Sequence, residues 1–242
     1  KILESHVASS SAKYSTGYMG MVAAGNDSEY FLVAATQRSG FSNSNAIQFY
    51  KVNDDGSSLS VVQYADLSSP SNSPTNLISN ELEDSMVFIS GGSSADSEFA
   101  VITNDKTQGP GDDRRLTKYS VDSSGNVQVL GNFDLENFGG SDQTFIEVVN
   151  SGTYIYIVTT SDEETSTSDI YVTQLNQDLS LNWEKIIDLT GLGYHERLGG
   201  VTSINFGSSG TGIAITGSTI GEDGGDFNGF ILLLDENGER IY

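Results

Sequence analysis

Short runs of apolar, β-branched and aromatic residues recur along the whole chain, separated by segments rich in Gly, Asn, Asp and Ser. Four of these runs have similar lengths and patterns: residues 47–52 (IQFYKV), 116–121 (LTKYSV), 170–175 (IYVTQL) and 230–234 (FILLL). Residues of these types favour β-strands, and the Gly, Asn and Asp between them favour tight turns. The pattern therefore predicts an all-β protein.

Each of the four runs is followed at once by an acidic or amide turn. The turns are residues 53–56 (NDDG), 122–125 (DSSG), 176–179 (NQDL) and 235–238 (DENG). An Asp or Asn at the start and a Gly in the left-handed position are hairpin signals. The regular return of one strand-and-turn pattern indicates that the chain is built from repeats.

Other predicted strands keep constant places around this marker. Two precede it in each repeat, at residues 18–24 and 30–36, 86–90 and 99–103, 145–149 and 154–160, and 201–206 and 213–217. One follows it, at residues 59–64, 127–133 and 181–189. Four-stranded antiparallel units repeated in this way are typical of β-propeller blades. We expect one propeller domain over residues 1–242, with blades at about 14–67, 78–135, 141–189 and 198–242.

The fourth unit lacks its last strand, since residues 239–242 (ERIY) end the sequence. Residues 1–7 (KILESHV) form a strand-like piece that belongs to no unit and is similar to residues 183–189 (WEKIIDL). A strand edge left unpaired invites association, so we expect residues 1–7 to close the last blade as its outer strand, within one chain or between copies. Alternatively, the chain is a part of a larger propeller.

Composition narrows the classes of partner. The chain has a net charge of −22 and no cysteine. The charge repels nucleic acid and anionic membranes, so neither is an expected partner, and no run is long enough for a membrane span. The lack of cysteine excludes disulfides, thiolate catalysis and cysteine-based zinc sites. This composition suits an exported bacterial protein.

The third and fourth units carry a family resemblance. Residues 200–219 (GVTSINFGSSGTGIAITGST) and 226–238 (DFNGFILLLDENG) resemble the bacterial SBBP-type β-propeller repeat, in which a strand ends in Thr-Gly-x-Thr and a later strand closes on Asp-x-x-Gly. Residues 169–183 (DIYVTQLNQDLSLNW) are similar, whereas the first two units match only in spacing and turn chemistry. The resemblance implies a bacterial secreted or cell-surface propeller, and it supplies no shared catalytic residues.

In a four-stranded blade, the loop after the second strand and the connection to the next blade lie on one face, which is the usual ligand face. Three of these loops are acidic, and their oxygens make calcium the candidate ion. The candidate metal ligands are Asp112, Asp113, Asp162, Glu163, Asp169, Asp223 and Asp226. The alternative is that these loops are ordinary solvated surface.

The corresponding loop of the first unit has no acid and carries Arg38, and residues 193–197 (GYHER) place His195, Glu196 and Arg197 on a connection between blades. These four residues are candidates for contacting a protein or a glycan. Trp183 is expected to pack between blades.

No Gly-x-Ser-x-Gly elbow is present, and the many carboxylates do not single out a catalytic pair. The leading hypothesis is a non-enzymatic extracellular binding or structural module. A polysaccharide-acting hydrolase or lyase and a lectin-like glycan-binding module are the alternatives.

Overall fold

The computed structural model describes residues 15–23, 30–38, 45–54, 59–66, 86–92, 95–105, 113–122, 127–135, 146–160, 169–189, 194–207, 210–221 and 227–241. For β1–β4 and for some strand ends, only the backbone is described. The secondary structure assigned to these residues is β-strand, apart from turns, bends, one isolated bridge and a single 3-10 position at Gly207, and it includes no α-helix. The predicted all-β class is therefore confirmed, and no helix in the described part is long and apolar enough to cross a membrane.

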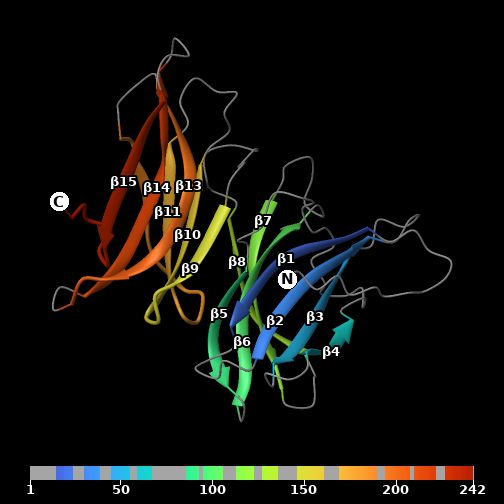
Figure 1. The fold of residues 1–242 in the computed structure, drawn as a ribbon. Coiled ribbons are helices and arrows are strands. Elements are labelled where there is room, and N and C mark those ends of the chain that lie inside the picture. The colour runs from blue at the N-terminus through green and yellow to red at the C-terminus, as the bar shows by residue number, and fades with distance from the viewer. Residues whose placement is uncertain are drawn as a thin grey trace. The chain divides into compact units, whose positions relative to one another are not determined.

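The strands form four antiparallel sheets, each made of consecutive strands in sequence order (Figure 1). The first contains β1 (Ser15–Ala23), β2 (Tyr30–Arg38), β3 (Asn45–Asp54) and β4 (Leu59–Asp66). The second contains β5 (Met86–Gly92), β6 (Ala95–Asp105), β7 (Asp113–Val121) and β8 (Val127–Asp134). The third contains β9 (Ile146–Asn150), β10 (Tyr154–Thr160), β11 (Ile170–Asn176) and β12 (Leu181–Ile187). The fourth contains β13 (Tyr194–Asn205), β14 (Thr211–Gly221) and β15 (Phe227–Asp235).

Each of the fifteen strands in the described part of the chain overlaps a strand expected from the sequence. In the described residues, the last sheet contains three strands, and we expect a fourth strand beside β15. Residues 1–7, which we expect to supply that strand, lie outside the described residues.

The chain divides into two compact units. The N-terminal unit comprises Lys1–Pro110 and Thr117–Leu130, and the C-terminal unit comprises Gly111–Leu116 and Gly131–Tyr242. In the N-terminal unit, the ring of Phe99 stacks on that of Tyr119 with centroids 5.8 Å apart, and Lys118 and Glu98 form an ion pair at 2.8 Å. Both aromatic rings are buried, so this stack anchors β6 against β7.

In the C-terminal unit, the sheet β9–β12 packs on the sheet β13–β15 through an apolar cluster. Its buried members are Tyr156, Val158, Ile170, Val172 and Ile187 from the first sheet, and Leu198, Ile213, Ile215, Leu232 and Leu234 from the second. Burying each Ile or Leu of this cluster contributes about 1.5–3 kcal/mol. This contact holds the two sheets together and positions the site described below.

One glycine of the last sheet explains part of the Thr-Gly-x-Thr pattern. A Cβ atom on Gly217 would lie 2.1 Å from the carbonyl oxygen of Arg197 and 2.5 Å from the ring of Phe230. The Phe230 ring therefore occupies the space over Gly217 in the neighbouring strand. Only glycine permits this approach of β14 to β13 and β15.

Candidate functional site

Three residues predicted to lie on a connection between blades are in a strand instead. His195, Glu196 and Arg197 belong to β13, where they are opposite Ile220, Thr219 and Ser218 of β14. The strand begins at Tyr194, before the expected blade boundary at residue 198, because pairing with the extended β14 continues to Gly221.

The environments of these side chains differ. The Glu196 side chain is only 1% exposed, so this carboxylate does not face solvent, whereas Arg197 is exposed. Arg38 is the last residue of β2 and not a loop residue; its side chain and that of His195 are outside the described atoms. The structure thus brings Glu196 and Arg197 onto one strand without gathering the four residues into a described pocket.

Most of the candidate metal ligands lie outside the described residues, namely Asp112, Asp162, Glu163, Asp223 and Asp226. Asp113 is the first residue of β7, and Asp169 comes immediately before β11. Burial raises the pKa of Asp169, and the nearby carboxylate of Asp188 raises it further. Within the described residues, no group of three or more His, Cys, Asp or Glu side chains could hold a metal ion. A calcium site in these loops therefore stays a prediction.

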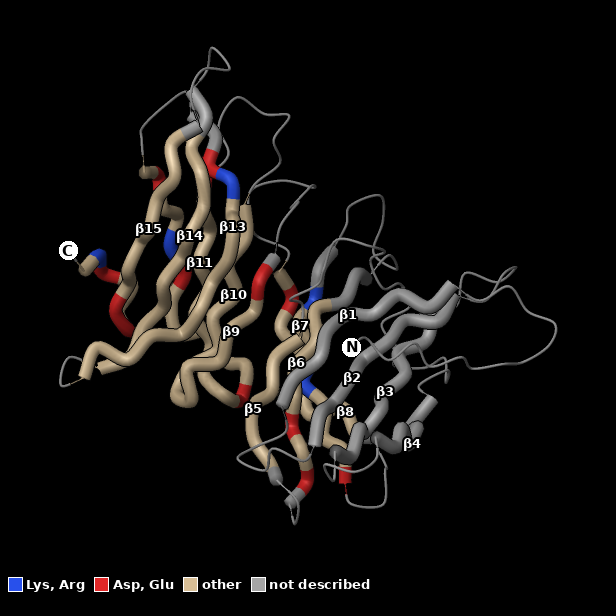
Figure 2. The backbone as a smooth tube through the Cα atoms, viewed as in Figure 1, with Lys and Arg blue, Asp and Glu red and all other residues tan. Residues whose placement is uncertain are grey.

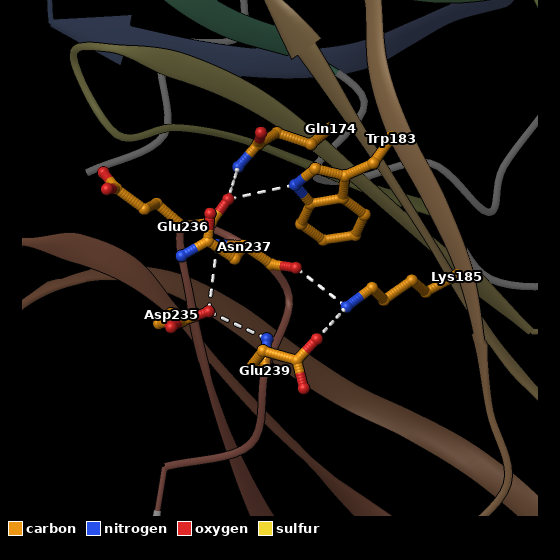
Figure 3. A network of polar contacts seen from close by, with 7 residues as sticks. All are labelled: Gln174, Trp183, Lys185, Asp235, Glu236, Asn237 and Glu239. Atoms are coloured by element: carbon orange, nitrogen blue, oxygen red, sulfur yellow. Dashed lines mark hydrogen bonds and ion pairs between the residues drawn. The ribbon is translucent and has the colours of Figure 1, made fainter.

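A network of polar contacts links the two C-terminal sheets (Figure 3). At its centre is Gln174 of β11, which is fully buried. Its amide nitrogen Nε2 donates to the hydroxyl of Tyr156 at 2.7 Å and to the backbone carbonyl of Glu236 at 2.8 Å. Its Oε1 accepts from the side-chain amide of Asn182. One amide side chain thus joins its own sheet to the turn that follows β15.

Two side chains of β12 bind the same turn. The indole nitrogen of Trp183 donates to the carbonyl of Glu236 at 3.0 Å. The ammonium group of Lys185 donates to the carbonyl of Asn237 at 2.8 Å and pairs with the carboxylate of Glu239 at 2.7 Å. Trp183 therefore packs between sheets, as expected from the sequence.

Gly238 permits this close packing. Its φ angle is +71°, and a Cβ atom there would lie 2.8 Å from Cη2 of Trp183 and 3.0 Å from Cδ of Lys185. The glycine is itself buried. The turn after β15 is thus shaped to receive the Trp183 ring.

A carboxylate makes a second junction between these sheets. Glu147 of β9 accepts a hydrogen bond from the backbone N–H of Val201 in β13. The register of β13 against β14 shifts between Leu198 and Gly200, just before Val201. A bulge of this kind turns backbone groups away from the ladder, and here an acid from the neighbouring sheet binds one of them.

The two sheets also contain the same hairpin. After β11, the N–H of Asn176 donates to the carbonyl of Ser180 at 2.9 Å, and that of Leu179 donates to the carbonyl of Asn176 at 3.0 Å. After β15, Asp235 donates to Glu239 at 2.9 Å, and Gly238 donates to Asp235 at 3.0 Å. The second hairpin continues into a single bridge, Leu234 to Arg240. Within the described residues, this bridge is an isolated pair outside the named strands.

Beyond that bridge, no described strand pairs with β15 on the side away from β14. An apolar groove of about 470 Å³ lies along this edge, lined by Leu189, Phe230, Ile231, Leu232, Leu233, Arg240 and Ile241. Ile231 is 75% exposed, the highest value among the exposed large hydrophobic residues of the described part. Figure 2 shows no charged residue along the described length of β15 before its C-terminal turn.

Sequence reasoning missed Gln174 and Lys185 as residues of the junction between the sheets. A glutamine inside an apolar run gives no sign that its amide is buried, because strand alternation would place such a residue in solvent. The edge of β15, in contrast, was predicted from the sequence as a strand edge that invites association.

Models of known protein families do not match this sequence. A comparison with curated proteins finds no relative of it either.

Proposed function

We propose that the chain is a non-enzymatic binding or structural module of the β-propeller type, from a bacterial secreted or cell-surface protein. The observation that carries this proposal is the repeated hairpin of the C-terminal unit. The turns at Asn176 and Asp235 have the same hydrogen bonds, and the sheets that carry them pack face to face. Successive copies of one antiparallel unit, packed in this manner, are what a propeller is made of.

The uses of polar side chains at the junction support a scaffold role. Gln174, Trp183 and Lys185 all bind backbone carbonyls of the neighbouring turn, and Glu147 binds a backbone N–H of the neighbouring sheet. Side chains that satisfy backbone groups fix one sheet against the next. In this part of the molecule, the polar side chains named above bind backbone groups of the neighbouring sheet, as expected of residues that hold a scaffold together.

Binding is assigned to the loops that connect the strands, where the acidic residues gather in the sequence. A protein or a glycan is the proposed ligand, and calcium is the proposed ion that would order these loops. Loops on a rigid β scaffold are a common place for binding residues, since they can vary without disturbing the sheets.

A panel of acidic and neutral polysaccharides, assayed for new reducing ends and for unsaturated products, tests the non-enzymatic part. We expect no turnover, together with retention on a glycan array or on an immobilised protein partner. Turnover that is lost in Asp162→Asn or Glu222→Gln but kept in Glu184→Gln, an exposed acid on β12, would overturn the proposal. The propeller part is tested by an experimental structure, in which sheets that are not arranged around a common axis would refute it.

A further inference from the structure

The turn after β15 contains one of the two Asn-Gly pairs of the chain, Asn237-Gly238, and the other, Asn228-Gly229, lies within β15. In such a pair the backbone nitrogen of the glycine can attack the side-chain amide carbon of the asparagine, because glycine has no side chain to obstruct the approach. The Asn237 side chain is exposed, and its amide makes no hydrogen bond to another described residue. It can therefore turn toward the nitrogen of Gly238.

Hydrogen bonds of the turn hold the attacking peptide group in place. The N–H of Gly238 donates to the backbone carbonyl of Asp235 at 3.0 Å, and the N–H of Asn237 donates to Oδ1 of the same residue at 2.9 Å. These bonds lie in the planes of the peptide groups. Attack on the side chain uses the electron pair perpendicular to the plane, so the bonds position the nitrogen without blocking its attack.

The ammonium group of Lys185, on β12, binds the same peptide group (Figure 3). It donates to the carbonyl oxygen of Asn237 at 2.8 Å. When the Gly238 nitrogen loses its proton, the negative charge spreads over that nitrogen and this oxygen, because both belong to one amide. A positive charge fixed beside a developing negative charge stabilises it. Lys185 therefore favours the ionised nitrogen, which is the attacking group.

We propose that Asn237 is a site of spontaneous deamidation, promoted by Lys185. The ionised nitrogen of Gly238 forms a bond to Cγ of Asn237, and the bond from Cγ to the side-chain nitrogen breaks. That nitrogen takes a proton from solvent and leaves as ammonia. Water then opens the succinimide ring at one of its two carbonyl carbons, which gives aspartate or isoaspartate. The inference is independent of the proposed function, because it rests on this turn and on β12 alone.

Either product weakens the junction between the C-terminal sheets. Isoaspartate adds one carbon to the backbone at position 237, which changes the spacing of the carbonyls that Gln174, Trp183 and Lys185 bind. Aspartate adds a negative charge to a turn whose other side chains are mainly acidic, and like charges repel. Because the loss of ammonia is irreversible, the modified fraction grows with the age of the chain.

Peptide mapping of the folded chain by mass spectrometry, at neutral and at mildly alkaline pH, tests the proposal. We expect a mass gain of about 1 Da at Asn237. Its rate should rise with pH, because the attacking nitrogen must lose its proton. Asn228 should react at least about fivefold more slowly, the equivalent of one ladder hydrogen bond. Its peptide group lies in the ladder, where Asn228 is opposite Thr219, and closing the ring turns that group out of the ladder.

A pair of lysine variants tests the part assigned to Lys185. Lys185→Met removes the charge and should slow the reaction about fivefold. Lys118→Met is the matched control, since Lys118 also pairs with an acid, Glu98, at 2.8 Å, and it should leave the rate unchanged. Loosening of the turn by Lys185→Met would speed the reaction, so a slower rate does not arise from lost stability.

Three outcomes overturn the proposal. The first is an Asn237 that stays intact in the folded chain while the urea-unfolded chain reacts there. The second is an Asn228 that reacts as fast as Asn237. The third is a Lys185→Met chain that reacts as fast as the wild type or faster.

Discussion

Replacing Gln174 with Leu tests whether the junction in Figure 3 stabilises the C-terminal unit. The leucine has nearly the same volume, so the variant mainly removes hydrogen bonds. It leaves the Tyr156 hydroxyl without the 2.7 Å hydrogen bond from the amide, and it leaves the carbonyl of Glu236 with the hydrogen bond from the indole of Trp183. A typical net hydrogen bond contributes about 1 kcal/mol, and a buried group left unsatisfied costs about 1–3 kcal/mol. We therefore expect a loss of about 2–3 kcal/mol, offset only slightly by the added apolar surface.

The chain provides its own reporter for this experiment, because Trp183 is its single tryptophan and lies within the junction. Urea unfolding followed by tryptophan fluorescence measures the free energy of the unit that contains it. In a thermal scan, the same loss corresponds to a Tm lowered by about 4–12 °C. Gln128→Leu, at an exposed position of β8, is the matched control and should leave the transition unchanged. A Gln174→Leu transition within about 0.5 kcal/mol of the wild type would refute the reasoning, because that is the size of an ordinary surface effect.

Four further predictions follow from the same structure. Gly238→Ala should lower stability by about 2 kcal/mol or more, measured by urea unfolding, because it combines a left-handed backbone with a clash against Trp183. Burial raises the pKa of Tyr156 to about 12, so stability should fall as pH rises above 10, and Tyr156→Phe should show a smaller fall in Tm between pH 9 and 12. The raised pKa of Asp169 means that its ionised form destabilises the fold; Asp169→Asn should therefore raise Tm at pH 7, with the gain vanishing in acid. Millimolar calcium should raise Tm reversibly with EDTA if the acidic loops bind it, and identical melting curves would leave them as solvated surface.

The strands were predictable because their signals are local. Residues 154–160 were expected as a strand and form β10 with the same bounds, since a Gly-containing turn precedes them and β-branched residues fill them. Strand ends were less predictable. β13 begins at Tyr194 and not near residue 201, because β14 offers partners as far as Gly221. His195 was predicted to lie on a connection, but it lies in β13 and pairs with Ile220. The prediction was wrong because pairing between strands cannot be inferred from single residues.

The burial of particular polar side chains could not be predicted for a related reason. Strand alternation predicts that one face of a strand is exposed to solvent. Every residue from Ile155 to Thr160 is buried, however, so both faces of β10 are covered. Whether an amide such as Gln174 faces solvent or a neighbouring carbonyl depends on which sheet packs there. The burial of such an amide therefore depends on contacts between residues far apart in sequence, here Gln174 and Glu236.

The two equivalent hairpins show how the repeats diverge while keeping one geometry. The fourth residue of each turn is left-handed, with φ of 68° at Leu179 and 71° at Gly238. A leucine in this conformation costs about 1–2 kcal/mol, and burial of its side chain, which is 5% exposed, offsets that cost by about 1.5–3 kcal/mol. At Gly238 no such compensation is available, because Trp183 of the neighbouring sheet occupies the place of a side chain. The glycine of the Asp-x-x-Gly signature is therefore required here by packing between sheets as well as by turn geometry, and a repeat whose turn does not receive a tryptophan is free to replace it.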